Sequence, residues 1–293
     1  MKTFSIYKQM SKEYFDIWTK RFEKVTPDYS EHPREDYHLQ SMKYLIFVIA
    51  DGVTLKRDEE GNYPNPSGSG ELAKLFCEAI ISEAEKLYET FSGADLKKVF
   101  EVGNNVAREF NVQKGFTKEN INYRENDFFA VAASFVLIKE SKMYWWSICD
   151  TGITMLDKDG NQVFLSPERG KEDETYFPVN WSELATTEQN KYIKKTFRNK
   201  LDKDGKQIGY GVANGEEGAL SYLNSGILSL LGGELTFLSS DGFENYFKLL
   251  EFVNLFINWS DDEENKLEYF SNLKIKENPR LYGQERSLII IKT

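Results

Sequence analysis

The sequence has few of the side chains that hold soft metals or act as catalytic nucleophiles. Its 293 residues include two cysteines and two histidines, His32 and His38. So few histidines exclude a multi-histidine zinc site and disfavour a Ser-His-Asp hydrolase. Cys77 and Cys149 both lie in apolar segments and neither heads a Cys-x5-Arg loop, which excludes a cysteine-nucleophile phosphatase and favours free thiols over a disulfide. Any enzymatic chemistry must therefore rely mainly on carboxylates, whose oxygens select Mg²⁺ or Mn²⁺ over zinc.

The chain also lacks long apolar runs and an excess of basic charge. No window approaches the roughly 18 apolar residues that span a bilayer, and the first residues do not form a secretory signal. We therefore expect a cytoplasmic protein with no membrane association. Acidic residues outnumber basic ones by 47 to 37, for a net charge of −10, which disfavours nucleic-acid binding because phosphate backbones are repelled. Nothing in the sequence indicates an oligomeric state.

The composition predicts one large folded unit. Hydrophobic residues make up 40% of the chain and aromatic residues 14%, which is enough for a sizeable core. There is no internal repeat and no low-complexity linker, so we predict a single domain over 1–293. Within it, residues 166–207 are highly charged and poor in apolar side chains. We predict a flap-like excursion there, carrying one helix near 183–200.

Two buried-strand patterns end in the same dipeptide. The run 43–50 is apolar and is followed by Asp51-Gly52, and the run 234–240 is followed by Asp241-Gly242. A carboxylate at the end of a buried strand needs a cation or hydrogen-bond donors, and glycine leaves the backbone carbonyl open to a ligand. One such pair fits a hairpin turn better than a metal site. Two pairs make a shared metal site as good an explanation as two turns.

The remaining pattern alternates between helical and strand periods. A polar stretch before residue 37 would come near Asp51 if 37–40 pairs antiparallel with 43–50. Asp150 follows another apolar run and supplies a third carboxylate at a strand end. Asp157-Lys158-Asp159-Gly160-Asn161 resembles the start of a calcium loop but lacks the later glutamate, so we predict a hairpin turn. The predicted helices are 70–90, 95–110, 216–225 and 243–257, with a helix or mixed segment in 1–30; the predicted strands are 128–138, 142–149, 153–156, 162–165 and 287–292.

Taken in order, these segments resemble the metal-dependent type-2C Ser/Thr protein phosphatases, the PPM family, from about residue 30 to the end. The matching segments are Arg34-Glu35-Asp36 for the family's Asn-Glu-Asp, Ala50-Asp51-Gly52-Val53 for its Asp-Gly, Asn65-Pro66-Ser67-Gly68 for a continuation seen in some bacterial members, Ala132-Ala133-Ser134 for Gly-Thr-Thr, Ile148-Cys149-Asp150-Thr151 for Val-Gly-Asp-Ser, Ser239-Ser240-Asp241-Gly242-Phe243 for Ser-Asp-Gly, and Gln284-Glu285-Arg286-Ser287-Leu288 for the final Asp-Asn or Asp-Asp. Their order and spacing together make the resemblance specific.

The resemblance implies an α+β fold, a four-layer α/β/β/α sandwich of two antiparallel sheets flanked by helices. It also implies two Mn²⁺ or Mg²⁺ ions, with a third, weaker one near Asp150, and hydrolysis of phosphoserine or phosphothreonine by a hydroxide that bridges two metals. Asp51 would bridge both ions, and Glu35 with Asp36 would hold bound waters. By position the implied catalytic residues are Asp36, Asp51 and Asp241, and the implied metal ligands are Asp36, Asp51, Gly52, Asp150, Asp241 and Gln284.

Several positions depart from the family pattern. Gln284 stands where the last ligand is usually Asp, and it supplies no negative charge, although the neighbouring Glu285 could substitute if the loop shifts. Asn245 stands where many members have another Asp. The phosphate-binding Arg expected four residues before Glu35 is Glu31, which leaves Arg34 as a displaced phosphate-binding candidate.

Three hypotheses follow from the sequence. The first is an active metal-dependent protein phosphatase with a phosphoprotein substrate. The second is a weakened or inactive phosphatase fold that serves as a phosphoprotein-binding or regulatory module. The third is an unrelated metal hydrolase whose Asp-Gly pairs arose by chance. The three acids at 36, 51 and 241 favour the first, whereas Gln284 and Asn245 favour the second.

Overall fold

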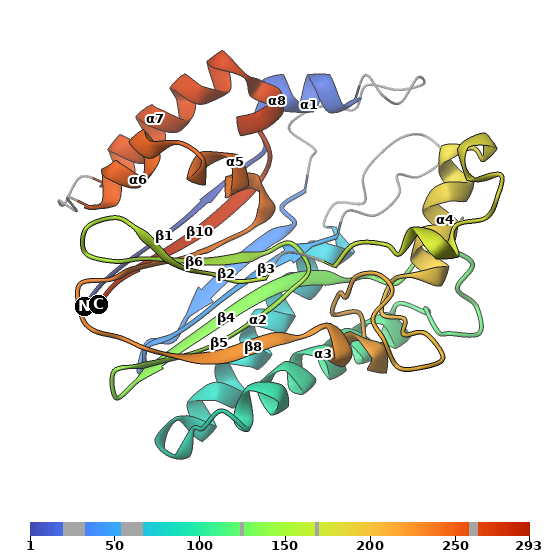
Figure 1. Ribbon diagram of the computed structural model, residues 1–293, viewed down its shortest axis with the longest axis horizontal. Helices are drawn as coiled ribbons and strands as arrows, with labels where there is room; N and C mark the ends of the chain where they lie inside the picture. Colours follow the sequence, from blue (N-terminus) through green and yellow to red (C-terminus); the bar gives the residue numbers. More distant parts are fainter. Residues whose placement is uncertain (20–32, 54–66, 124–125, 168–169, 258–262) are drawn as a thin grey trace.

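Two five-stranded antiparallel sheets form the centre of the molecule (Figure 1). The computed structural model describes residues 1–19, 33–53, 67–123, 126–167, 170–257 and 263–293. The sheet that we name the terminal sheet has the order β1 (Lys2–Lys8), β10 (Arg286–Lys292), β9 (Leu235–Ser239), β6 (Gly152–Leu156) and β7 (Gln162–Leu165). The sheet that we name the central sheet has the order β2 (Asp36–Gln40), β3 (Ile46–Gly52), β4 (Val131–Lys139), β5 (Lys142–Ile148) and β8 (Asn224–Ser229).

Helices cover the outer face of each sheet (Figure 1). The long helices α2 (Gly68–Leu87) and α3 (Asp95–Gln113) lie on the central sheet, and their apolar side chains form one buried cluster with those of β3, β4 and β5. On the terminal sheet lie α5 (Glu244–Phe247), α6 (Leu250–Ile257), α7 (Glu263–Glu277) and α8 (Pro279–Tyr282), with α1 (Lys12–Thr19) beside α8. The order of layers is therefore helix, sheet, sheet, helix, as the resemblance implied.

A third buried cluster joins the two sheets face to face. Phe47 and Ile49 of β3 and Trp145 of β5 meet Leu238 of β9 and Ile289 of β10 there. Alternate residues of β3 point to opposite faces, and both faces are buried, which explains the unbroken apolar run in its sequence. The inner strands are thus packed on both faces, which fixes the positions of the residues at their ends.

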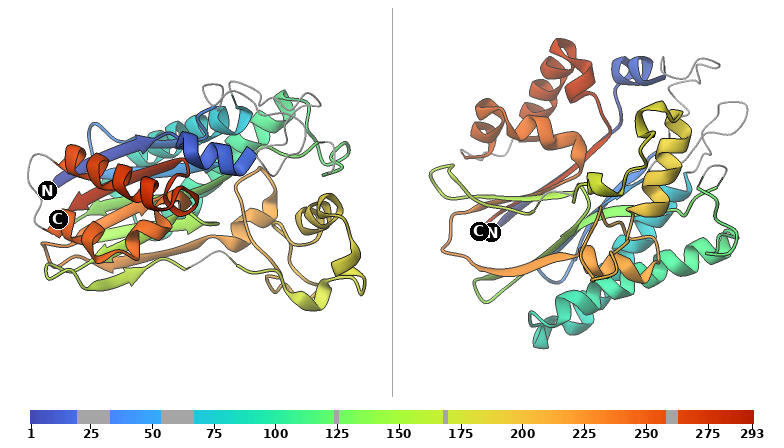
Figure 2. Two further views of the ribbon diagram at one scale, coloured as in Figure 1. Left: turned by 90° about the horizontal axis from the view of Figure 1, so that it is seen from above. Right: turned by 45° about the vertical axis from the view of Figure 1, so that its right-hand side comes forward.

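The segment 166–207, which we name the flap segment, projects from one end of the sandwich (Figure 1, Figure 2). It contains the helix α4 (Thr186–Thr196), within the predicted range of 183–200. The chain ends lie at the opposite end of the sandwich, where Lys2 pairs with Lys292. No helix in the described ranges is both long and apolar enough to cross a membrane.

The structure sharpens or corrects several expectations about individual elements. The first segment, expected to be a helix or mixed segment, is mixed: it begins with β1, in which Phe4 and Ile6 alternate inward, and α1 follows. The helix predicted over 216–225 is a short 3-10 helix followed by β8, an edge strand with alternating burial. The helix predicted over 243–257 is divided into α5 and α6. The sequence did not indicate α7 because its charged residues leave little apolar periodicity.

Candidate functional site

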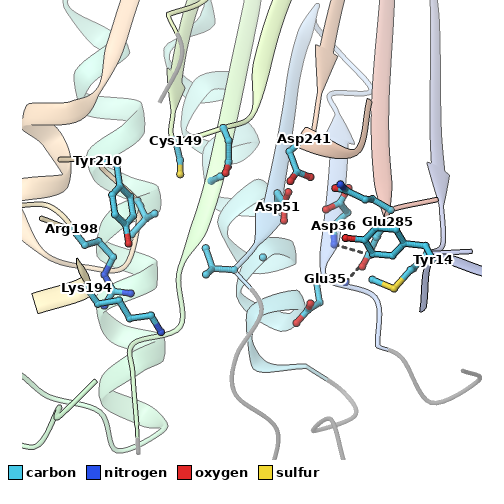
Figure 3. A pocket seen from close by; sticks show the side chains of 17 residues that line it. Tyr14, Glu35, Asp36, Asp51, Cys149, Lys194, Arg198, Tyr210, Asp241 and Glu285 are labelled. Carbon is cyan, nitrogen blue, oxygen red and sulfur yellow. Dashed lines mark hydrogen bonds between the residues drawn. The ribbon is translucent and has the colours of Figure 1, made fainter. Parts of the chain in front are cut away.

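Acidic side chains from five separate parts of the chain line one cavity at the flap end of the sandwich (Figure 3). The cavity has a volume of about 310 Å³. Its acidic lining residues are Glu35, Asp36, Asp51, Asp150, Asp241 and Glu285, and Gln284 lines it as well. The first Asp-Gly pair ends β3 and the second follows β9 after one residue, so both strand ends bring carboxylates to the same place.

The strand register sets the position of Asp36 relative to Asp51. The two residues are direct partners in the antiparallel pair β2–β3. Side chains of directly opposite residues point to the same face, with Cβ atoms about 5 Å apart. The predicted pairing of 37–40 with 43–50 is therefore confirmed, and it brings the acidic first residue of β2 next to the one at the end of β3.

Hydrogen bonds across the two sheets hold Asp36 in place. Ser240 Oγ donates to Asp36 Oδ2 at 2.6 Å and accepts from the backbone N of Ser287 at 2.9 Å. Glu285 Oε1 accepts from the backbone N of Glu35 at 2.8 Å and from that of Asp36 at 3.0 Å. Residues beside β9 and β10 thus anchor the start of β2, which belongs to the other sheet.

Gly52 allows the end of β3 to approach its neighbours closely. A Cβ at this position would lie 2.8 Å from backbone atoms of Ser69 and 2.9 Å from the carbonyl oxygen of Glu35. The Gly52 N–H donates to that carbonyl at 3.2 Å. Any side chain here would push apart α2, β3 and the segment before β2, all of which line or support the cavity.

Burial and mutual repulsion raise the pKa values of the acidic cluster. Burial raises the pKa of Asp51 well above its usual value, and the charges of Asp36 and Asp241 raise it further. Burial also raises the pKa of Asp36 well above its usual value, with Glu285 as the next contribution. The pKa of Asp241 is raised to about 7, again first by burial and then by the charge of Asp150. Carboxylates placed so close together favour a bound cation.

Solved structures of Ser/Thr phosphatases share this architecture over nearly the whole chain. PppA, a regulatory component of the T6SS in Pseudomonas aeruginosa, is 13% identical with a TM-score of 0.56, and the match covers 100% of this chain and 97% of that one. A bacterial serine phosphatase is 10% identical with a TM-score of 0.55, covering 99% and 96%. The Mycobacterium tuberculosis phosphatase PstP/Ppp is 11% identical with a TM-score of 0.53, covering 99% and 97%. The chain has the type-2C phosphatase fold. No protein-family model and no curated protein matches the sequence.

The oxygen donors that line the cavity are chemically suited to a hard divalent cation. The available donors are carboxylate oxygens and the Gly52 carbonyl, which are the ligands that Mg²⁺ and Mn²⁺ prefer. In the described part of the chain, no group of three or more His, Cys, Asp or Glu side chains already has the arrangement of a metal site. The fit therefore lies in the donor types and their raised pKa values, and side-chain movements would have to complete the coordination.

The predicted ligands differ in how directly they face the cavity. Glu35 lines it, but its Oε1 accepts from Ser67 Oγ at 2.7 Å, which turns the carboxylate toward the start of α2 (Figure 3). The backbone carbonyl of Gln284 accepts from Arg286 Nη1 at 2.7 Å. The neighbouring Glu285 points into the acidic cluster, and burial raises its pKa. Asn245 is not among the lining residues of the cavity.

Arg34, the predicted phosphate-binding residue, makes its contacts outside the cavity. Its Nε donates to the Asp36 carbonyl at 2.7 Å. Its guanidinium lies 4.0 Å from the ring centre of Tyr7 and 5.1 Å from that of Tyr37. It is not among the residues that line the cavity. Glu31, where the family has its arginine, and Asn65-Pro66 lie outside the described residues.

The sequence did not identify the basic residues of the cavity. Lys194 and Arg198 of the flap segment line it, opposite the acidic cluster (Figure 3). Their common partner is Asp127, 71 residues before Arg198. The only available signal was the excess of basic residues between 191 and 206, which we interpreted as part of a highly charged, flap-like excursion.

Cys149 occupies the position before Asp150 where the family has glycine. The backbone conformation of Cys149 explains why glycine is preferred there. Its φ is +66°, in the left-handed region that side chains other than glycine adopt at a cost. Both cysteines of the chain are free thiols, as expected from the sequence, and Cys149 lines the cavity. The turn that presents Asp150 is therefore strained in this chain.

Proposed function

We propose that this chain is a metal-dependent protein Ser/Thr phosphatase that hydrolyses phosphoserine or phosphothreonine with two Mn²⁺ or Mg²⁺ ions. The observation that supports this proposal is the convergence of Asp36, Asp51, Asp241 and Glu285 in one buried cavity of a type-2C fold. These residues come from separated segments, and each has a raised pKa that a cation would relieve.

The residues that would hold the ions are assigned as follows. Asp51, at the end of β3, would serve both ions, and Gly52 would offer its carbonyl oxygen. Asp36, fixed by Ser240, would face Asp51 from the neighbouring strand, and Asp241 would complete the second ion's ligands. Glu285 or Gln284 would occupy the last position, and Asp150 would bind a third ion more weakly. When bound, the ions would supply a water of lowered pKa and positive charge beside the phosphoryl group.

The decisive test is hydrolysis of p-nitrophenyl phosphate in the presence of Mn²⁺. We expect Asp51→Asn and Asp241→Asn each to reduce turnover by about 10³-fold or more, since each removes a charge needed to hold an ion. Asp159→Asn, in the exposed turn between β6 and β7, is the matched control and should keep full activity. As a second measurement, Mn²⁺ should raise the melting temperature of the wild type but not of Asp51→Asn.

One observation favours the alternative of a phosphoprotein-binding or regulatory module. The family's last acidic ligand is Gln284 here, and Glu285 already binds two backbone amides. If the wild type neither hydrolyses p-nitrophenyl phosphate nor binds Mn²⁺ by calorimetry, the phosphatase proposal fails. Binding of a phosphoserine peptide without turnover would then support the module.

A further inference from the structure

The flap segment builds the wall of the cavity that faces the acidic cluster. Lys194 comes from the last turn of α4, and Arg198 lies two residues beyond the end of that helix. Tyr210 and Val212, from the returning chain, line the same wall. Figure 3 shows Lys194 and Arg198 across the cavity from Asp51 and Asp241. The two walls therefore carry opposite charges.

The charge on the flap wall is not fully neutralised. Arg198, with 2% of its side chain exposed, contacts both oxygens of Asp127 at 2.5 and 3.1 Å. Lys194 lies 2.7 Å from Asp127 Oδ2, and 31% of its side chain is exposed. Two cations thus share one carboxylate, which leaves one net positive charge at the wall.

Both cations also keep hydrogen-bonding capacity. A lysine ammonium has three donors, and the bond to Asp127 uses one. Arg198 Nε is buried and has no hydrogen-bond partner within the described ranges of the chain. The remaining donors of Lys194, which is partly exposed, would match an anion with several acceptor oxygens, such as phosphate.

A phosphate monoester entering this cavity needs such a cation. It carries about −1.5 to −2 charges at neutral pH, and it must approach a cluster of carboxylates. Arg34 is held between Tyr7 and Tyr37 and donates to a backbone carbonyl. Among the described residues that line the cavity, Lys194 and Arg198 are the basic side chains.

We propose that Lys194 binds the phosphoryl group of the substrate from the flap wall, with Arg198 and Asp127 holding it in position. This inference rests on the proposed function and deepens it, because it names the residue that selects a phosphate dianion. In this chain the phosphate contact would come from the flap segment in place of Arg34, which does not line the cavity.

The test measures the binding of inorganic phosphate, a reaction product that is not consumed, by calorimetry in the presence of Mg²⁺. Lys194→Gln should weaken phosphate binding about tenfold, the size of one charge-assisted hydrogen bond. Lys195→Gln is the matched control, because it is the next residue on α4, is exposed, and does not line the cavity. Both variants remove the same charge, so long-range electrostatics is equal in the two. Lys194→Arg should restore most of the affinity.

Kinetics provide the second measurement. Lys194→Gln should raise KM for p-nitrophenyl phosphate about tenfold and lower kcat by less than about threefold, since a ground-state contact is removed. Equal phosphate affinity in Lys194→Gln and Lys195→Gln, or no phosphate binding by the wild type, would overturn the inference. Phosphate binding that depends on Lys194 in a protein without turnover would uphold it and overturn only the proposed catalytic activity.

Discussion

The two walls of the cavity are built on different principles. The acidic wall consists of residues at the ends of strands that are packed between the other layers, and adjacent strands hold these residues in position. The flap wall consists of side chains on a projecting segment. A buried ion pair between Arg198 and Asp127, 71 positions away, holds them in place. Strand ends therefore fix the proposed metal donors, whereas one charge cluster at Asp127 fixes the flap wall.

Removing the arginine at the base of the flap wall should have the largest effect on stability. Arg198→Met leaves the buried Asp127 with Lys194 alone, and breaking a buried ion pair costs about 3 kcal/mol. Urea denaturation measures the loss. Lys114→Met, which removes a half-exposed pair with Glu71, should cost less than about 1 kcal/mol. Equal losses in the two variants would show that the Asp127 cluster does not hold the flap segment.

The corresponding change on the acidic wall should have a smaller effect. Glu285→Ala leaves the backbone N–H groups of Glu35 and Asp36 without their acceptor, which should lower the free energy of unfolding by about 2 kcal/mol. Part of this loss is offset because one repelling charge leaves the cluster. Gln284→Ala is the control, since only its backbone carbonyl has a hydrogen bond to Arg286 among the described contacts, and it should change stability by less than about 0.5 kcal/mol. A loss at Gln284 as large as that at Glu285 would refute this anchoring role.

The smallest effect should come from relieving strain between the walls. Cys149→Gly removes a side chain from a left-handed backbone position, which should stabilise the fold by about 0.5–1 kcal/mol after the greater unfolded-chain entropy of glycine is subtracted. Cys149→Ala keeps the strain and serves as the control. Thermal unfolding of both variants gives the comparison; a gain in the alanine variant equal to that in the glycine variant would contradict the assignment of strain.

The same contrast explains which parts of the site could be predicted from sequence. Asp51 and Asp241 could be predicted because apolar runs mark buried strands and their ends are local in sequence. Asp36 followed from one antiparallel pairing. Arg198 and Asp127 could not be predicted, since neither belongs to a local pattern and their contact depends on how the flap segment folds back.

The fold shows a similar division. The long apolar runs that form β3, β4 and β10 were clear in the sequence, as was the amphipathic pattern of α2. The edge strand β8 was missed because it is short and its residues alternate between partly buried and exposed. The strand β1 was not distinguished from the helix that follows it because the more regular spacing of the later residues dominated the segment. In both cases tertiary pairing, which single-sequence patterns do not contain, decided the structure.

Glu285, which anchors the start of β2, binds main-chain atoms at residues 35 and 36. Because Glu285 accepts from amides, the identities of the side chains at positions 35 and 36 do not enter this contact. Substitutions at position 35 should therefore leave this main-chain contact in place, with one exception. Proline has no amide hydrogen, so it would remove one of the two bonds that join the start of β2 to Glu285 and leave the Asp36 amide to hold that contact alone.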